Sequence, residues 1–205
     1  MLPDPVVHLV DDDEAVRHSL AFLLASAGFA VRTYDSAAAF LDALEAVRPG
    51  CVVTDVRMPG LSGLALQREL ISRRIGLPVI VMTGHGDVKL AVEAMKAGAV
   101  DFIEKPFQDE VMLTAIRAAF DRYARDTRHH DEANAVEARL HTLTMREREV
   151  LDGLLAGHPN KTIAHELNIS ARTVEVHRAN VMTKMGAANL PELVRMVLLS
   201  RTPGV

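Results

Sequence analysis

Short apolar runs alternate with helix-period segments through residues 1–124. The runs are Val6–Val10, Phe29–Thr33, Cys51–Asp55, 78–83 and 100–103. Capping residues open three of the segments between them, and these candidate N-caps are Asp13, Ser36 and Asp87. A strand followed by a helix, repeated five times, predicts a five-stranded parallel sheet covered by helices on both faces. We expect the flavodoxin-like strand order 2-1-3-4-5.

The pattern changes at residue 125. Residues 125–141 are polar, contain no Pro or Gly, and carry only a narrow apolar stripe of Ala133, Val136 and Leu140. We interpret this segment as a helical linker. The sequence leaves open whether it is one continuous helix with the segment that begins near Asp109.

Residues 142–205 show short helices in place of strands. Thr144 and Glu147 form a candidate capping box, Asn160 is a candidate cap for residues 161–167, and Ser170 for residues 171–185. A fourth helix is expected over residues 189–199. The tight turn at residues 168–170 predicts a helix-turn-helix within an all-α four-helix domain.

The charge of the 205-residue chain is –4 and is unevenly divided. Residues 1–124 hold 12 Lys and Arg against 17 Asp and Glu, and residues 125–205 hold 11 against 10, so charge alone does not predict nucleic-acid binding. Cys51, the single cysteine, fits a core position and a reducing, cytoplasmic setting. We expect no membrane span, because no run of eighteen or more apolar residues is present, and no secretory signal, because the N-terminus shows no basic region followed by an apolar one.

Acidic side chains gather where predicted strands end. Asp11 and Asp12 end the first strand and Asp55 ends the third, so all three are expected to meet at the switch point of the sheet. Carboxylates that converge need a neutralising cation, and an all-oxygen ligand set favours Mg2+. A carboxylate can also attack a phosphoryl group, whose oxygens Thr83 and Lys105, at neighbouring strand ends, are placed to contact.

A simpler interpretation is that these acids only begin an exposed helix. It suits Asp13 and Glu14, but it does not explain the acid and the lysine at other strand ends. Four motifs, Asp11–Asp12, DVRMPG at 55–60, MTGHG at 82–86 and FIEKP at 102–106, resemble a two-component response-regulator receiver domain.

The resemblance implies a role for each matching position. Asp55 would be the phosphoacceptor, Thr83 the switch hydroxyl, Lys105 the phosphate-sensing amine and Phe102 the switch aromatic. The ligands of Mg2+ would be Asp11, Asp12, Asp55 and the backbone carbonyl of Arg57. The resemblance further implies a cis bond between Lys105 and Pro106.

The helix predicted for 171–185 has two distinct sides. Its inner side would carry Val174, Val181, Met182 and Met185, and Arg178 would form an internal ion pair near that side. Small apolar groups on the outer side suit thymine methyls, and Asn180 suits a base edge. We expect the DNA contacts to be Lys161, Thr162, Arg172, Thr173, Glu175, Val176, Ala179, Asn180 and Lys184, with the lysines and Thr162 suited to phosphates.

Segments of this half resemble the LuxR/NarL-type DNA-binding domain. They are LTMREREVL at 143–151, NKTIA at 160–164 and SARTVEVHR at 170–178. As a whole the chain is similar to response regulators that activate nitrogen-fixation genes. This resemblance implies a sensor histidine kinase that responds to oxygen, promoter DNA of fixation or microaerobic genes, and RNA polymerase as partners.

The segment from Val88 to Ala97 is a candidate dimerisation helix. We expect Val88, Val92 and Met95 to point inward. The outer face would then carry Lys89, Leu90, Glu93 and Ala94, a modest apolar surface on which phosphorylated chains dimerise.

Two other function classes compete with a phosphorylation-controlled activator. The first is a Mg2+-dependent aspartyl-phosphate phosphatase with haloacid-dehalogenase-like chemistry, but Val56 and Arg57 follow Asp55 where such enzymes carry a second acid. In the regulator interpretation the only chemistry is phosphorylation and dephosphorylation of the chain itself. The second is a receiver that acts on RNA or protein, which the outer face of the 171–185 helix disfavours.

Overall fold

The computed structural model describes residues 5–84 and 88–201, with the side chain of Arg201 excepted. Asp87, a predicted N-cap, lies outside the described residues. The chain forms two compact units, residues 1–126 and 127–205. Among the described helices, none is both long and apolar enough to cross a membrane.

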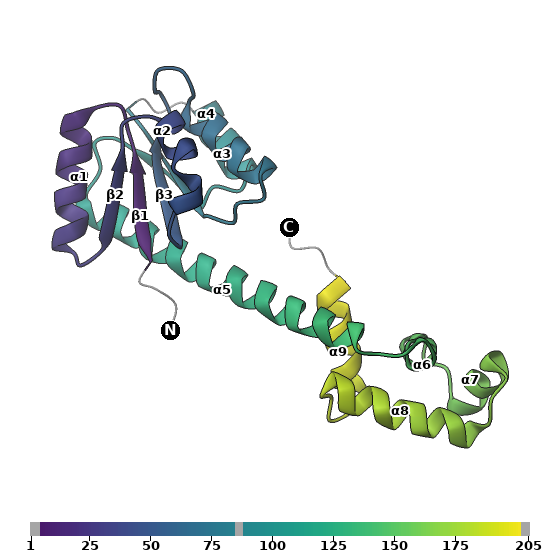
Figure 1. Ribbon diagram of the computed structural model, residues 1–205. Helices are drawn as coiled ribbons and strands as arrows, with labels where there is room; N and C mark the ends of the chain where they lie inside the picture. Colours follow the sequence, from purple (N-terminus) through teal and green to yellow (C-terminus); the bar gives the residue numbers. More distant parts are fainter. Residues whose placement is uncertain (1–4, 85–87, 202–205) are drawn as a thin grey trace. The chain divides into compact units, whose positions relative to one another are not determined.

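The first unit is an α/β domain with one five-stranded parallel sheet, in the order β2-β1-β3-β4-β5, as predicted (Figure 1). Its strands are β1 Val6–Val10, β2 Ala30–Tyr34, β3 Gly50–Asp55, β4 Val79–Thr83 and β5 Asp101–Glu104. Its helices are α1 Glu14–Ser26, α2 Ala37–Asp42, the 3-10 helix Leu44–Ala46, α3 Gly63–Ser72, α4 Val88–Lys96 and the start of α5 Asp109–His141.

Two apolar layers cover the sheet because successive strand residues point to opposite faces. Cys51 and Val53 of β3 pack in one layer, against α1 and α5, whereas Val52 packs in the other, against α2, α3 and α4. The central strands β1, β3 and β4 are buried along their whole length, which explains their continuous apolar runs.

Helix starts in this unit follow the capping chemistry of the sequence. The side chain of Asp13 accepts hydrogen bonds from the backbone N–H groups of Ala15 and Val16, and Ser36 accepts from Ala39. Gly28 follows α1 with a positive φ of 87°, a conformation that glycine adopts without strain. Both predicted caps are confirmed.

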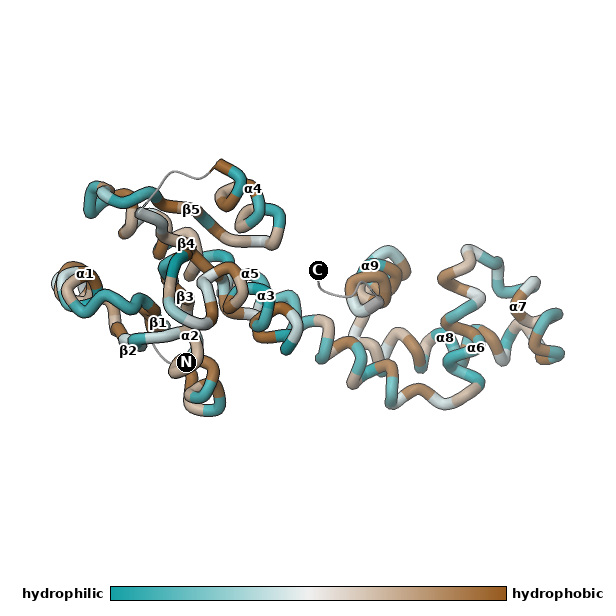
Figure 2. The backbone as a smooth tube through the Cα atoms, turned by 90° about the horizontal axis from the view of Figure 1, so that it is seen from above, coloured by the Kyte–Doolittle hydropathy of each residue, from teal (hydrophilic) through white to brown (hydrophobic). Residues whose placement is uncertain are grey.

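The second unit is a bundle of short helices. They are α6 Met145–Leu155, α7 Asn160–Leu167, α8 Ala171–Met185 and α9 Leu190–Arg201, and the C-terminal part of α5 also packs in it. Apolar residues, brown in Figure 2, predominate along α9, and Leu193 and Val197 on it are fully buried. The residues predicted to form a linker are therefore helical, and they continue the helix that starts at Asp109.

Capping in this unit is confirmed at two of three positions. Thr144 and Glu147 form the predicted capping box, and the hydroxyl of Ser170 accepts from the N–H of Thr173. The third prediction was wrong: α7 begins at Asn160, and Pro159 is the N-cap residue. The side-chain oxygen of Asn160 is instead an acceptor for Arg178, so it does not serve the helix end.

Candidate functional site

Lys105 joins two carboxylates at the carboxyl edge of the sheet. Its Nζ atom donates to Oδ2 of Asp11 at 2.8 Å and to Oδ1 of Asp55 at 2.7 Å. Both acids are nearly enclosed, with 1% and 8% of their surfaces exposed. The sequence placed these three residues together from strands far apart in the chain, and the structure brings them into direct contact.

The strand register explains why the acids converge. Val10 of β1 lies beside Thr54 of β3, so the residues that follow each of them emerge at the same edge of the sheet. The N–H of Arg57 donates to Oδ2 of Asp55 at 2.7 Å, which orients that carboxylate. Oδ1 of Asp11 accepts from the N–H of Asp13 at 2.9 Å.

The electrostatic state of Lys105 reflects these partners. Burial by itself lowers the pKa of the amine, but hydrogen bonds to Asp11 and Asp55 outweigh it, and the pKa lies above its usual value. The amine is therefore a stable cation at neutral pH. It offsets the repulsion between the two carboxylates.

The third carboxylate departs from the prediction. Asp12 is exposed, and nowhere in residues 5–84 and 88–201 do three His, Cys, Asp or Glu side chains form a group placed to hold a metal ion. Asp11 and Asp55 both contact the ammonium of Lys105. The atoms available to bind a metal here are nevertheless all oxygens. Oδ2 of Asp11 and Oδ1 of Asp55 face the same cation, and such a set of oxygen ligands suits a hard ion such as Mg2+.

Thr83 and Phe102 lie on the adjacent strands β4 and β5. Thr83 ends β4 and is buried, and its carbonyl accepts from the N–H of Lys105 at 2.7 Å. Phe102, on β5, is partly buried against the apolar layer that includes Ala94 of α4. The peptide bond between Lys105 and Pro106 is cis, as the resemblance implied.

The orientation of α4 is opposite to the one predicted. Ala94 is fully buried and Leu90 packs against the core, whereas the predicted inward residues Val88, Val92 and Met95 are 75%, 46% and 47% exposed.

Close packing of α4 against α3 accounts for this orientation. The side-chain amide of Gln67 on α3 donates to the carbonyls of Ala94 and Ala97 at 3.2 and 3.1 Å. Glu93 forms an ion pair with Arg68, also of α3. A helix held this near its neighbour buries its small residues, so Ala94 does not lie on a surface available to a second chain.

Helix α8 has the predicted inner side. Val174, Val181 and Met185 are fully buried and Met182 packs against them. The left-handed backbone of Asn168 (φ 54°) ends α7 and forms the tight turn before α8. The turn and this inner side together confirm the helix-turn-helix arrangement.

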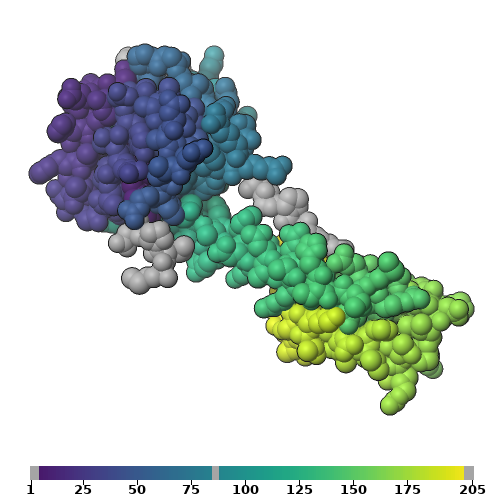
Figure 3. Space-filling model, viewed as in Figure 1, coloured from purple at the N-terminus to yellow at the C-terminus, as the bar shows by residue number. Residues whose placement is uncertain are grey.

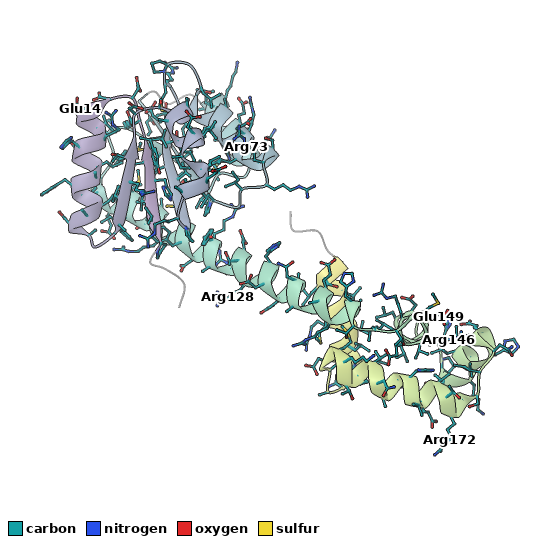
Figure 4. The ribbon with its side chains drawn as sticks, in the orientation of Figure 1. Glu14, Arg73, Arg128, Arg146, Glu149 and Arg172 are labelled. Atoms are coloured by element: carbon teal, nitrogen blue, oxygen red, sulfur yellow. The ribbon has the colours of Figure 1, made fainter. Side chains whose placement is uncertain are left out.

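The outer side of α8 presents most of the residues predicted to contact DNA. Arg172 points away from the helix bundle (Figure 4). Val176 is 55% exposed although it is apolar. The other exposed members on α8 and α7 are Glu175, Ala179, Asn180, Lys161 and Thr162.

Three residues of this unit make internal contacts other than those that the sequence predicted. Lys184 forms an ion pair with Glu147, with Nζ 2.6 Å from Oε2, so its charge is directed to α6. The hydroxyl of Thr173 lies 2.8 Å from that of Ser170, within the helix cap. The internal ion pair expected of Arg178 is a hydrogen bond to the amide oxygen of Asn160 at 3.4 Å.

Sequence reasoning missed two contacts that hold α8. It did not identify Glu147 as the partner of Lys184, nor the contact of Arg139 with the carbonyl of Met185 at 2.9 Å. The first pair is separated by 37 residues and the second by 46, so no local sequence pattern predicts them.

Comparison with known proteins agrees with both units. Residues 7–117 match the family described as response regulator receiver domain, and residues 141–197 match bacterial regulatory proteins of the luxR family. Transcriptional regulatory protein FixJ of Azorhizobium caulinodans is 61% identical over 95% of this chain and 92% of its own length. The FixJ protein of Rhizobium meliloti is 57% identical over 96% of this chain and 97% of its own.

A solved structure gives the same assignment. Full-length FixJ from B. japonicum is 51% identical and superposes with a TM-score of 0.60, covering 96% of this chain and 97% of that one. These relatives are named as transcriptional regulatory proteins, which favours the regulator interpretation over the phosphatase interpretation. The chain therefore belongs to the response regulators of the FixJ type, in which a receiver domain is joined to a LuxR-family DNA-binding domain.

Proposed function

We propose that this chain is a transcription activator controlled by phosphorylation of Asp55. The observation that carries the proposal is the cation bridge at the sheet edge, where Lys105 contacts both Asp11 and Asp55. An oxygen of Asp55 attacks the phosphorus of a phosphohistidine on a sensor kinase. An O–P bond forms, the N–P bond breaks, and the electron pair returns to the imidazole.

The residues around Asp55 suit the product of this transfer. Lys105 and the hydroxyl of Thr83 are the groups proposed to bind phosphoryl oxygens. The proposed ligands of Mg2+ are Asp11, Asp12, Asp55 and the backbone carbonyl of Arg57. Bound Mg2+ would offset negative charge on the phosphoryl group and on the acids.

Dimerisation is the proposed consequence of phosphorylation. Movement of Thr83 toward the phosphoryl group leaves Phe102 to repack against α4, which changes the surface next to β5. Of the residues first proposed for the dimer surface, Lys89 and Glu93 remain candidates. The exposed stripe of Val88, Val92 and Met95 replaces Leu90 and Ala94, which pack against the core, as the apolar part of that surface.

DNA binding is proposed for α8. Val176, Ala179 and Asn180 are placed to contact base edges in the major groove, with Arg172 beside them. Lys161 and Thr162, near the start of α7, are proposed to contact phosphates, aided by the positive end of that helix. Two chains joined through their receivers would present two recognition helices to neighbouring half-sites.

The likeness to the FixJ relatives, named as transcriptional regulatory proteins, supports a proposal for the remaining partners. We propose an oxygen-responsive histidine kinase as phosphodonor, RNA polymerase as the recipient of the signal, and promoters of nitrogen-fixation or microaerobic genes as targets. Such a regulator would act in the cytoplasm.

The test is phosphoryl incorporation measured by intact mass. Wild-type protein with acetyl phosphate and Mg2+ should gain one phosphoryl group, and omission of Mg2+ should strongly reduce the gain. Asp55→Asn should gain none, while Asp12→Asn should react slowly because a proposed metal ligand is missing. Equal incorporation by wild type and Asp55→Asn would refute the assignment of Asp55.

A further inference from the structure

The last part of α5 is built into the DNA-binding unit. Val136 is 7% exposed and Leu140 is partly buried, and both pack in the apolar cluster that contains Val181 and Met185 of α8. Figures 1 and 3 show this teal-to-green end of α5 lying beside the yellow-green helices of the same unit. These residues share a core with the recognition helix, so they are more than a spacer.

Arg139, on this part of α5, holds the end of α8. Its Nη1 atom donates to the carbonyl of Met185 at 2.9 Å, and Met185 is the last residue of that helix. Carbonyls in a final helical turn lack partners within the helix and carry the negative end of its dipole, so a guanidinium there is favourable. Arginine keeps its charge at every physiological pH.

The backbone after α8 leaves room for this contact. Gly186 ends the helix with a positive φ of 68°, and a Cβ atom there would lie 3.3 Å from Nη1 of Arg139. The glycine therefore serves the turn and also allows the guanidinium to approach. A side chain at this position would crowd the cap as well as strain the backbone.

Further hydrogen bonds attach the end of α5 to the helices of the DNA-binding unit. Nζ of Lys184 donates to the carbonyl of Thr142 at 3.2 Å as well as to Glu147. Arg148 on α6 donates to the carbonyl of Leu140 at 2.8 Å. The end of α5, the start of α6 and the last turn of α8 are thereby joined in one polar network.

We propose that Arg139 is a positioning residue for DNA recognition, and that residues 127–141 belong to the DNA-binding domain and contribute to recognition. By fixing the last turn of α8, Arg139 sets the angle at which Val176, Ala179 and Asn180 meet base edges. This inference rests on the proposed binding of DNA by α8. Base-edge contacts depend closely on angle, whereas phosphate contacts tolerate small rotations, so loss of Arg139 should reduce sequence discrimination more than general affinity.

The test compares two duplexes with the full-length, phosphorylated chain. One duplex is selected by wild type from a random pool, and the other is an unselected duplex of equal length. Arg139→Gln should weaken binding to the selected duplex about tenfold, the effect of losing one charge-assisted hydrogen bond. Binding to the unselected duplex should match that of Arg125→Gln, which removes the same charge from an exposed position of α5.

Two controls separate positioning from damage to the fold. Arg139→Lys keeps a cationic donor and should restore part of the lost discrimination. Amide exchange in the last turn of α8 should accelerate in Arg139→Gln while exchange in α6 stays slow. Equal discrimination by Arg139→Gln, Arg125→Gln and wild type would overturn the role of Arg139. Failure of wild type to enrich any duplex would instead contradict DNA recognition itself, and the positioning role with it.

Discussion

Lys184 and Glu147 form an ion pair with 2.6 Å between Nζ and Oε2, although the sequence favoured a DNA phosphate as the partner of this lysine. Glu147 is 4% exposed and also accepts from the N–H of Thr144 in the capping box. The lysine therefore completes the hydrogen bonding of a buried carboxylate. It connects the last turn of the recognition helix with the first turn of α6.

Replacing Lys184 with methionine tests whether its ion pair with Glu147 stabilises the second unit. The variant should lose about 1–3 kcal/mol of unfolding free energy, because a buried acceptor loses its charged partner. Urea denaturation of the full chain, followed by a probe in the second unit, measures this loss.

Lys161→Met supplies the matched comparison for DNA binding, since Lys161 is the proposed phosphate contact. The slope of log affinity against log salt should fall by about one for Lys161→Met and stay unchanged for Lys184→Met. An equal decrease in both slopes would indicate that Lys184 also contacts a DNA phosphate.

The same pair predicts a dependence of stability on pH. The hydrogen bond from Lys184, with that from Thr144, lowers the pKa of Glu147 from 4.5 to about 2. Because the folded-state pKa is depressed, its contribution to stability is complete above pH 4.5 and is lost as the pH falls toward 2. The unfolding free energy of wild type minus that of Glu147→Gln should shrink over this window. A difference that stays constant between pH 5 and pH 3 would argue against the ion pair.

The exposed stripe on α4 predicts which substitutions prevent dimerisation. Val92→Asp should raise the dissociation constant of the phosphorylated dimer at least about tenfold, because a charge would be buried against apolar surface. Ile71→Asp on α3 is the control, since Ile71 is an apolar residue that is 55% exposed outside the stripe. Sedimentation velocity measures both. If Ile71→Asp disrupts the dimer and Val92→Asp does not, the interface lies elsewhere.

Local sequence patterns predicted most of the fold. The continuous apolar runs of β1, β3 and β4 predicted buried parallel strands, and Asp13, Ser36, Thr144 and Ser170 marked helix starts, because both signals arise within a few residues. Strand-end positions were enough to bring Asp11, Asp55 and Lys105 together.

The errors arose where burial depends on distant partners. Apolar residues occur on two sides of α4, so periodicity could not choose between Val92 and Ala94 as the inward residue. Contacts from Gln67 of α3 decide it. The contacts of Arg139 and Lys184 likewise join segments that only the tertiary packing brings together.

The most direct test of phosphorylation control is molar mass by light scattering, with Mg2+ and acetyl phosphate, for wild type and Asp55→Asn. Wild type is expected to double its mass only when both reagents are present, and Asp55→Asn is expected to stay monomeric. A wild type that takes up the phosphoryl group yet remains monomeric would contradict this expectation, as would Asp55→Asn that dimerises equally well.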